Sequence, residues 1–204
     1  DVNSAAAKCK KKLGNRWENF ANAWRTTQLE YTWLRSLMKK HENFWKITED
    51  SLDHTMETFK IKKTMRGELL NLYKELNIYP EVKECLDNLK SKKIKISILS
   101  NGTPNLLKSL VESNNIQNYF DDIMSIEAVG IYKPDSKVYE MPINKYGCKP
   151  ENICFLSSNT WDVSGGGVFG YNAIWVNRFN KVFDKLSYEP RFVINNLNQL
   201  LEIV

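Results

Sequence analysis

The first third of the chain carries apolar residues at the spacing of one face of an α-helix. The positions at i, i+3, i+4 and i+7, with their continuation, are Trp17, Phe20, Ala21, Trp24, Tyr31, Leu34 and Met38. A second stripe starts at Phe44, and a third runs from Met65 to Leu76 before the break at Tyr79-Pro80. We therefore expect residues 5–79 to form a bundle of three or four short helices.

Beyond Pro80 the pattern changes to alternating helices and strands. A helix at 82–89 leads into 94–99, where Ile-Lys-Ile-Ser-Ile-Leu has the period of two that is typical of a strand. Further strands are expected at 123–126, 153–156 and 173–176, separated by helix-length segments with glycine or proline. This order predicts a Rossmann-like, largely parallel sheet in an α/β core at 80–204, next to a helical domain at 1–79.

Polar residues follow three of these strands, where ligands bind in open parallel sheets. Ser100-Asn101-Gly102-Thr103-Pro104 follows the first, with Thr103 suited to cap a helix and Pro104 suited to its first turn. Tyr132-Lys133-Pro134 follows the second, and Ser157-Ser158-Asn159-Thr160-Trp161-Asp162 the third. Together they indicate an anion site with one lysine and a carboxylate able to act as a base.

Composition and charge narrow the classes of function. The 204 residues are 42% hydrophobic and contain no apolar run long enough to cross a membrane, nor a start typical of a secretory signal, so we expect a cytoplasmic protein. The net charge of +5 comes from lysines interleaved with acids, which argues against nucleic-acid binding. The four cysteines are scattered and predict reduced structural thiols: Cys9, Cys85, Cys148 and Cys154.

The order of these motifs resembles the haloacid dehalogenase superfamily, in particular its L-2-haloacid dehalogenase branch. The resemblance is carried by residues 99–102, by Tyr132-Lys133-Pro134 with Val138-Tyr139-Glu140, and by 157–159 with Trp161-Asp162. It extends to Arg25 and residues 28–35, which look like a helix of that family's cap domain. The similarity covers nearly the whole chain and implies the haloacid dehalogenase fold.

The resemblance implies a reaction without a cofactor or metal. In that branch an aspartate attacks C2 of an L-2-haloacid, halide leaves, and water hydrolyses the aspartyl ester to a 2-hydroxy acid. A small-molecule 2-haloacid would be the substrate, and a homodimer is implied. The implied catalytic residues are Lys133, Asp162, Ser157, Asn159 and Tyr139, with Ser157 and Asn159 positioning Asp162 and Tyr139 supporting the lysine. The implied substrate-binding residues are Ser100, Asn101, Arg25, Leu29, Phe44 and Trp161.

The family's first strand, which ends in the nucleophilic aspartate, has no counterpart in these residues. Asp1-Val2-Asn3-Ser4 matches the tail of that segment, so we expect the strand and the nucleophile upstream of residue 1. That strand lies inside the family's sheet, and its neighbours would otherwise keep unpaired edges.

Alternative interpretations exist for the function and for single residues. A phosphatase of the same superfamily would need acids for magnesium, but Ser157 and Ser158 stand where such a pair is expected. A catalytically dead binding protein is the other rival. Arg25 and Lys133 could be exposed surface residues, and Phe44 and Trp161 ordinary core aromatics.

Three further features point to structure. Gly165-Gly166-Gly167 lacks the ending of a phosphate loop, which favours close helix packing. Pro142 falls inside an expected helix and is expected to kink it. His41 and His54 lack partners at metal-ligand spacing and are interpreted as surface or hydrogen-bonded histidines.

Overall fold

The computed structural model describes residues 10, 13–72, 74 and 76–204. The chain divides into two compact units, one made of 1–79 with 100–118 and the other of 80–99 with 119–204. Each unit is described below by itself. In the part of the chain that is described, no helix is long and apolar enough to cross a membrane.

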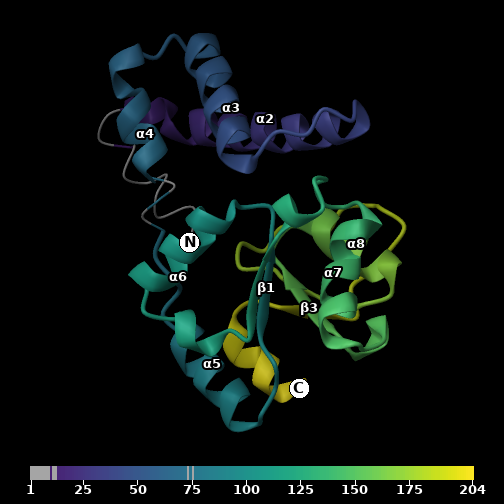
Figure 1. The fold of residues 1–204 in the computed structure, drawn as a ribbon. Coiled ribbons are helices and arrows are strands. Elements are labelled where there is room, and N and C mark those ends of the chain that lie inside the picture. The colour runs from purple at the N-terminus through teal and green to yellow at the C-terminus, as the bar shows by residue number, and fades with distance from the viewer. Residues whose placement is uncertain (1–9, 11–12, 73, 75) are drawn as a thin grey trace. The chain divides into compact units, whose positions relative to one another are not determined.

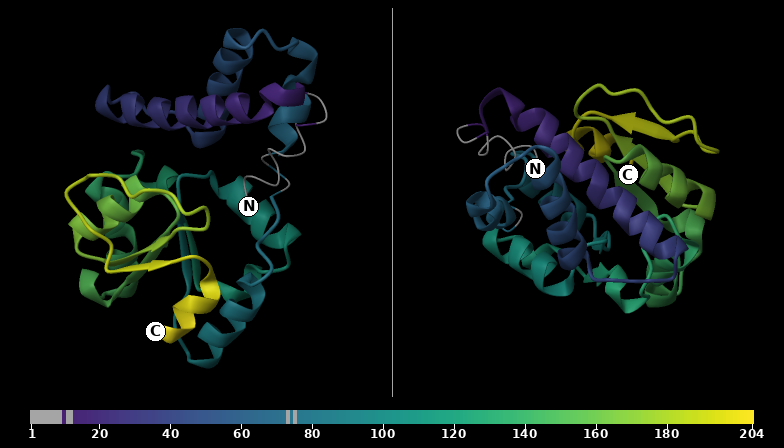
Figure 2. Two further views of the ribbon diagram at one scale, coloured as in Figure 1. Left: turned by 180° about the vertical axis from the view of Figure 1, so that it is seen from behind. Right: turned by 90° about the horizontal axis from the view of Figure 1, so that it is seen from above.

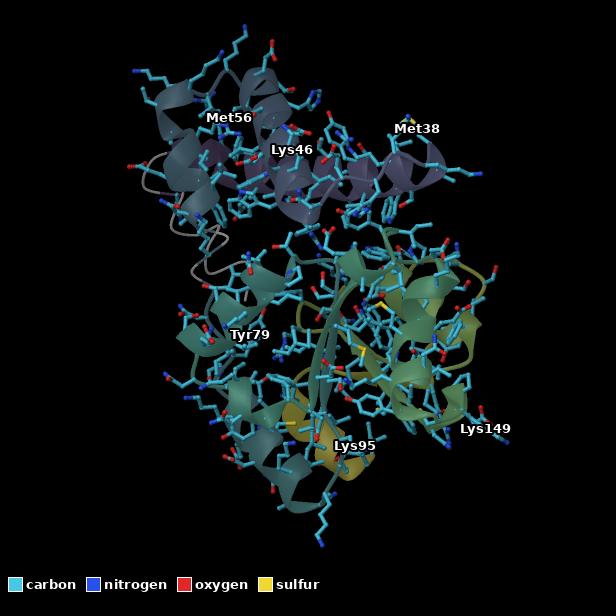
Figure 3. The ribbon with its side chains drawn as sticks, viewed as in Figure 1. Met38, Lys46, Met56, Tyr79, Lys95 and Lys149 are labelled. Carbon is cyan, nitrogen blue, oxygen red and sulfur yellow. The ribbon has the colours of Figure 1, made fainter. Side chains whose placement is uncertain are left out.

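The first unit is built on two long helices. They are α2 (Trp17–Leu37) and α3 (Phe44–Thr58), which lie side by side in Figures 1 and 2, followed by the shorter α4 (Arg66–Leu72). Asn43 caps α3 by accepting a hydrogen bond from the Lys46 amide. Part of each predicted stripe forms this unit's core, where Met56 of α3 is buried whereas Lys46 of the same helix is exposed (Figure 3). Leu34 and Met38 were predicted on the first stripe but are exposed, so the end of that stripe was wrong.

The third predicted helix was too long. The Asn114 side chain explains the difference, because its Nδ2 donates to the Leu76 carbonyl at 2.9 Å and its Oδ1 accepts from the Ile78 amide at 3.2 Å. An amide side chain thus satisfies backbone groups that a helix would otherwise pair internally. The helix ends at Leu72, and Leu76 lies outside it.

The same unit contains α6 (Pro104–Ser113), whose start agrees with the sequence. Thr103 is the N-cap, its Oγ1 accepts from the Leu106 amide, and Pro104 occupies the first turn.

The second unit is an α/β domain. Its helices are α5 (Val82–Ser91), α7 (Ser136–Tyr146) and α8 (Thr160–Phe169). Its strands are β1 (Ser97–Ser100, whose last residue belongs to the first unit), β2 (Asp122–Ser125), β3 (Cys154–Ser157), β4 (Asn172–Val176) and β5 (Phe192–Ile194). β3, β4 and β5 are parallel, with Phe155 opposite Ala173 and Trp175 opposite Val193, so the expected parallel sheet is confirmed.

Two strand predictions need correction. The first strand begins at Ser97 instead of Ile94, because the Ile94 amide donates to the Leu89 carbonyl and Lys93 has a φ of 58°, which makes these residues the closing turn of α5. The three-residue strand β5 was not predicted, since it is too short to show a period. Pro142 is buried inside α7, which runs on to Tyr146.

The described strands form two separate sheets, β1-β2 and β3-β4-β5. A cavity of about 660 Å³ is lined by residues 97–99 of β1 and 154–156 of β3, with Pro142 and Tyr146 of α7. The apolar residues of β1 and β3 are only partly buried, whereas residues 173–176 of β4, which is paired on both sides, are buried. Strands of a parallel sheet are normally covered on both faces, and here the apolar residues of β1 and β3 line the cavity instead.

Candidate active site

The second unit brings together three predicted site residues. Asp162, in the first turn of α8, and Lys133, in the loop before α7, are each 5% exposed, and Lys133 Nζ lies 3.1 Å from Asp162 Oδ2. Tyr139 of α7 is fully buried and donates its hydroxyl to Asp162 Oδ1 at 2.8 Å. Burial of Lys133 rules out the interpretation of an exposed loop lysine.

These contacts create a polar centre in an aromatic surrounding. Lys133 Nζ lies 4.9 Å from the centroid of the Phe155 ring, a distance at which cation and ring attract. Burial, followed by the negative charge of Asp162 and the hydrogen bond to it, raises the pKa of Tyr139 far above its usual range. Tyr139 therefore stays protonated and donates its hydrogen bond at any working pH.

Tyr139 is itself held from two sides. The Tyr171 hydroxyl donates to the Tyr139 carbonyl, and the rings of Phe155 and Tyr171 meet the Tyr139 ring edge to face at 5.8 and 5.9 Å. Gly165 approaches the hydroxyl so closely that a Cβ there would lie 2.6 Å from Tyr139 Oη and 2.7 Å from Pro134 Cβ. The glycine run of α8 thus packs against its neighbours, as expected.

The close approach at Gly165 gives a testable prediction. Gly165→Ala is expected to displace Tyr139 from Asp162 and to lower the free energy of unfolding by about 1–3 kcal/mol through overpacking. Gly67→Ala is the matched control, because Gly67 lies in α4 with nothing within 4 Å of a Cβ, and there alanine should stabilise by up to about 1 kcal/mol. Urea titration measures both variants. Equal effects of the two substitutions would contradict the packing role of Gly165.

The other predicted residues of this unit lie at the turn before α8. The Asn159 amide donates to Ser157 Oγ at 3.2 Å, and the Asp162 amide donates to the Asn159 carbonyl at 3.1 Å. The expected geometry differs in detail, since among the described residues the Asp162 carboxylate is held by Lys133 and Tyr139 and not by the Ser157 and Asn159 side chains. Trp161, in the first turn of α8, is half-buried.

The first unit holds the remaining predicted residues. Ser100 Oγ accepts from the Gly102 amide at 3.1 Å, and Asn101 Oδ1 is buried without a hydrogen-bond partner among the described residues. Phe44 is buried at the start of α3, and Leu29 is half-buried on α2.

Arg25 lies on α2, half-buried, and donates through Nη1 to Gln28 Oε1 at 2.7 Å. Gln28 and its partner Thr48 are fully buried. Neither Gln28, Thr48 nor Tyr171 was predicted as part of a site. A signal existed for Gln28, which occupies the buried stripe of α2 in series with Phe20 and Trp24, where apolar residues are the rule.

Expectations from the sequence also covered a metal site, the cysteines and the histidines. Within the described residues no three His, Cys, Asp or Glu side chains lie close enough to hold a metal ion. Cys85, Cys148 and Cys154 are free, and burial raises the pKa of the Cys85 thiol, which agrees with a structural role for that residue. Cys154 is exposed, and Cys9 lies outside the described residues. His54 lies on the exposed side of α3, with its ring 6.2 Å from that of Tyr31.

The second unit thus has the arrangement expected from the sequence, a parallel α/β sheet with a buried lysine–aspartate pair beyond the carboxyl ends of its strands. The comparison with protein families agrees, because residues 3–170 match the model of the haloacid dehalogenase-like hydrolases. The chain belongs to this family.

Individual relatives are similar over the whole chain. The chain is 35% identical to (S)-2-haloacid dehalogenase 1 of Pseudomonas sp. strain CBS-3, covering 100% of this chain and 91% of the relative. It is 37% identical to an (S)-2-haloacid dehalogenase of Pseudomonas fluorescens, covering 98% and 89%. The L-2-haloacid dehalogenase of Xanthobacter autotrophicus with chloropropionic acid covalently bound matches with a TM-score of 0.91 at 28% identity, covering 100% and 92%.

Proposed function

We propose that this protein hydrolyses L-2-haloacids to 2-hydroxy acids through an aspartyl ester. The observation that carries the proposal is the buried Lys133–Asp162 pair, in a chain that matches (S)-2-haloacid dehalogenases over its whole length. The covalently bound chloropropionic acid in the Xanthobacter enzyme supports a covalent intermediate.

The reaction has two steps. A carboxylate oxygen of the nucleophilic aspartate attacks C2, and the carbon–halogen bond breaks as halide leaves with the electron pair. Water then adds to the ester carbonyl, which regenerates the carboxylate and releases the 2-hydroxy acid and a proton. No step requires a metal or an organic cofactor.

The second unit would supply the groups that neutralise the charge of the nucleophile and orient the hydrolytic water. Lys133 provides the positive charge that neutralises the nucleophile and its ester, and a charge in a buried site acts more strongly than one in water. Asp162 keeps lone pairs beyond those taken by Lys133 and Tyr139, since a carboxylate offers about four, and these can orient the hydrolytic water. Ser157 and Asn159 fix the turn that carries Asp162.

The first unit would supply the groups that bind substrate. Arg25 and Asn101 are proposed to cradle the departing halide, and Ser100 to hold the substrate carboxylate. Leu29 and Phe44, together with Trp161 of the second unit, are proposed to contact the alkyl part. Arg25 suits a halide because its partner in the described structure is the neutral Gln28, which leaves its charge uncompensated.

The nucleophile is proposed to reside on a strand that fills the cavity between β1 and β3. The cavity is lined by both strands and by apolar side chains, which suits an extended apolar segment. A strand in this position would join the two sheets into one and would end near the carboxyl ends of its neighbours. An aspartate at that end would be on the same edge of the sheet as the loops that carry Lys133 and Asp162.

The substrate class is tested with both enantiomers of 2-chloropropanoate. Protein that carries such a strand is expected to release chloride from the L-enantiomer and to leave the D-enantiomer essentially unreacted. Activity should persist in excess EDTA, because no step passes through a metal. Magnesium-dependent release of phosphate from a phosphate ester, without chloride release, would instead identify a phosphatase, and silence in both assays would favour a binding protein.

We also propose a cytoplasmic homodimer. The free thiols suit a reducing compartment, and Leu34, Leu37 and Met38 at the end of α2 are 51%, 79% and 61% exposed, which is an apolar surface suited to an interface. Light scattering coupled to size-exclusion chromatography measures the mass, and cell fractionation the compartment.

A further inference from the structure

A buried chain of hydrogen bonds links Arg25 to the backbone of α3. Arg25 Nη1 donates to Gln28 Oε1 at 2.7 Å, Gln28 Nε2 donates to Thr48 Oγ1 at 2.7 Å, and the Thr48 hydroxyl donates to the Phe44 carbonyl at 2.7 Å. Gln28 and Thr48 are both 0% exposed. These hydrogen bonds run from α2 to α3 within one compact unit, so the packing of the two helices fixes their geometry.

In this series of hydrogen bonds, the donor and acceptor roles of each group are determined by the next group in the series. Because the Thr48 hydroxyl proton is used on the Phe44 carbonyl, Thr48 Oγ1 can only accept from Gln28. The amide nitrogen of Gln28 must therefore face Thr48, and its oxygen must face Arg25. The guanidinium is thus held by an acceptor whose orientation cannot reverse.

The partner is also neutral, which distinguishes Arg25 from Arg35 and Arg66 of the same unit. Arg35 pairs with Asp50 at 3.2 Å and Arg66 with Asp53 at 2.6 Å, whereas in the described part of the chain no carboxylate lies within ion-pair distance of Arg25. Positioning by an amide keeps the full positive charge available to an external anion.

We propose that Gln28 and Thr48 are positioning residues that hold the Arg25 guanidinium in place to bind the halide. The inference rests on the proposed function, in which Arg25 contacts the leaving group. Fixing the guanidinium in advance removes the entropy that a flexible arginine would lose on binding, and displacement of a binding group by about 1 Å can cost on the order of 100-fold in rate.

Thr48→Val is the decisive substitution, because it keeps the shape and removes the hydroxyl that accepts from Gln28. Thr55→Val is its matched control. Thr55 is likewise buried on α3 and donates its hydroxyl to the Ser51 carbonyl, four residues earlier, at 2.7 Å. Among the described residues no side chain donates to the Thr55 hydroxyl. Thr48→Ser retains the hydroxyl and should rescue the effect.

Binding is measured on the chain itself by titration with sodium bromide, followed through the Nε–H nuclear magnetic resonance signal of Arg25. Thr48→Val is expected to weaken bromide binding about tenfold and to broaden this signal, whereas Thr55→Val and Thr48→Ser should match the unmodified chain. Equal losses in Thr48→Val and Thr55→Val, or no loss in Thr48→Val, would overturn the positioning role. Absence of bromide binding by the unmodified chain would overturn it as well.

Turnover separates this inference from the proposed function. In strand-carrying protein, Thr48→Val is expected to lower kcat/KM for L-2-chloropropanoate about 10- to 100-fold, with Thr55→Val near the unmodified value. If the unmodified protein binds bromide through Arg25 but releases no chloride, the proposed function fails while the positioning role stands. If chloride is released and Thr48→Val turns over normally, the positioning role fails alone.

Discussion

Lys133→Met is expected to lower the free energy of unfolding by about 3–5 kcal/mol, because it leaves Asp162 as a buried charge without its cationic partner. The methionine matches the stem of the lysine in size, so the loss should come from the charge and not from a cavity. Chemical denaturation measures the loss.

Two further variants make this prediction specific. Lys145→Met breaks the pair of Lys145 with Asp122 at 2.8 Å in the same unit, where the side chains are 54% and 28% exposed, and should cost far less stability than Lys133→Met. The double variant Lys133→Met with Asp162→Leu removes both buried charges and should recover much of the lost stability. A double variant less stable than Lys133→Met would contradict the idea that an unpaired charge is the cause.

Activity should not follow stability in this series. In the strand-carrying protein, Lys133→Met is expected to lower kcat by about 100- to 1000-fold, the loss typical of removing one preorganised electrostatic group. The double variant should remain inactive although its stability recovers, because it lacks both the charge and the water-orienting carboxylate. Recovery of both properties together would show that the pair serves only stability.

A strand that ends in aspartate and fills the cavity between β1 and β3 is expected to give the largest change in activity. Protein without this strand should release no measurable halide, and the strand-carrying protein should be active. Replacing the strand's aspartate with asparagine should cost on the order of 10⁶-fold, as the loss of a catalytic nucleophile does in a serine protease.

Hydrogen exchange separates the structural part of this effect from the chemical part. Ile98, Leu99, Phe155 and Leu156 line the cavity, and those of their amides that point toward the added strand should gain protection when it is present, with aspartate or asparagine alike. A strand with proline at its centre should lose both protection and activity, because proline cannot donate to the sheet. Activity without added protection would contradict the cavity as the strand's position.

Much of the fold follows from local patterns in the sequence. The helical stripe from Trp17 to Trp24, the cap at Thr103 and the strand at 173–176 each depend on neighbouring residues, and the structure confirms them. The errors fall where a distant group decides. The side chain of Asn114 hydrogen-bonds to the backbone of Leu76 and Ile78, and the turn that ends α5 takes the residues expected to start β1.

The site residues also divide into those that neighbouring residues predict and those that depend on distant contacts. Lys133 and Asp162 could be predicted because each follows a strand. Their direct contact depends on how α7 and α8 pack, and so does the fact that Tyr139, and not Asn159, binds the Asp162 carboxylate. Gln28 and Thr48 lie 20 residues apart on two helices, and only their packing makes them partners. Sequence spacing within one element carries no information about such pairs.

The covalent intermediate gives the most direct test of the proposed reaction. The strand-carrying protein is quenched during turnover of L-2-chloropropanoate, and peptide mass spectrometry locates any attached propanoate group. We expect the group on the aspartate of the strand, and none when that residue is asparagine. Chloride release without an adduct, or an adduct on Asp162, would contradict the assignment of Asp162 and Lys133 as groups that support a nucleophile on the strand.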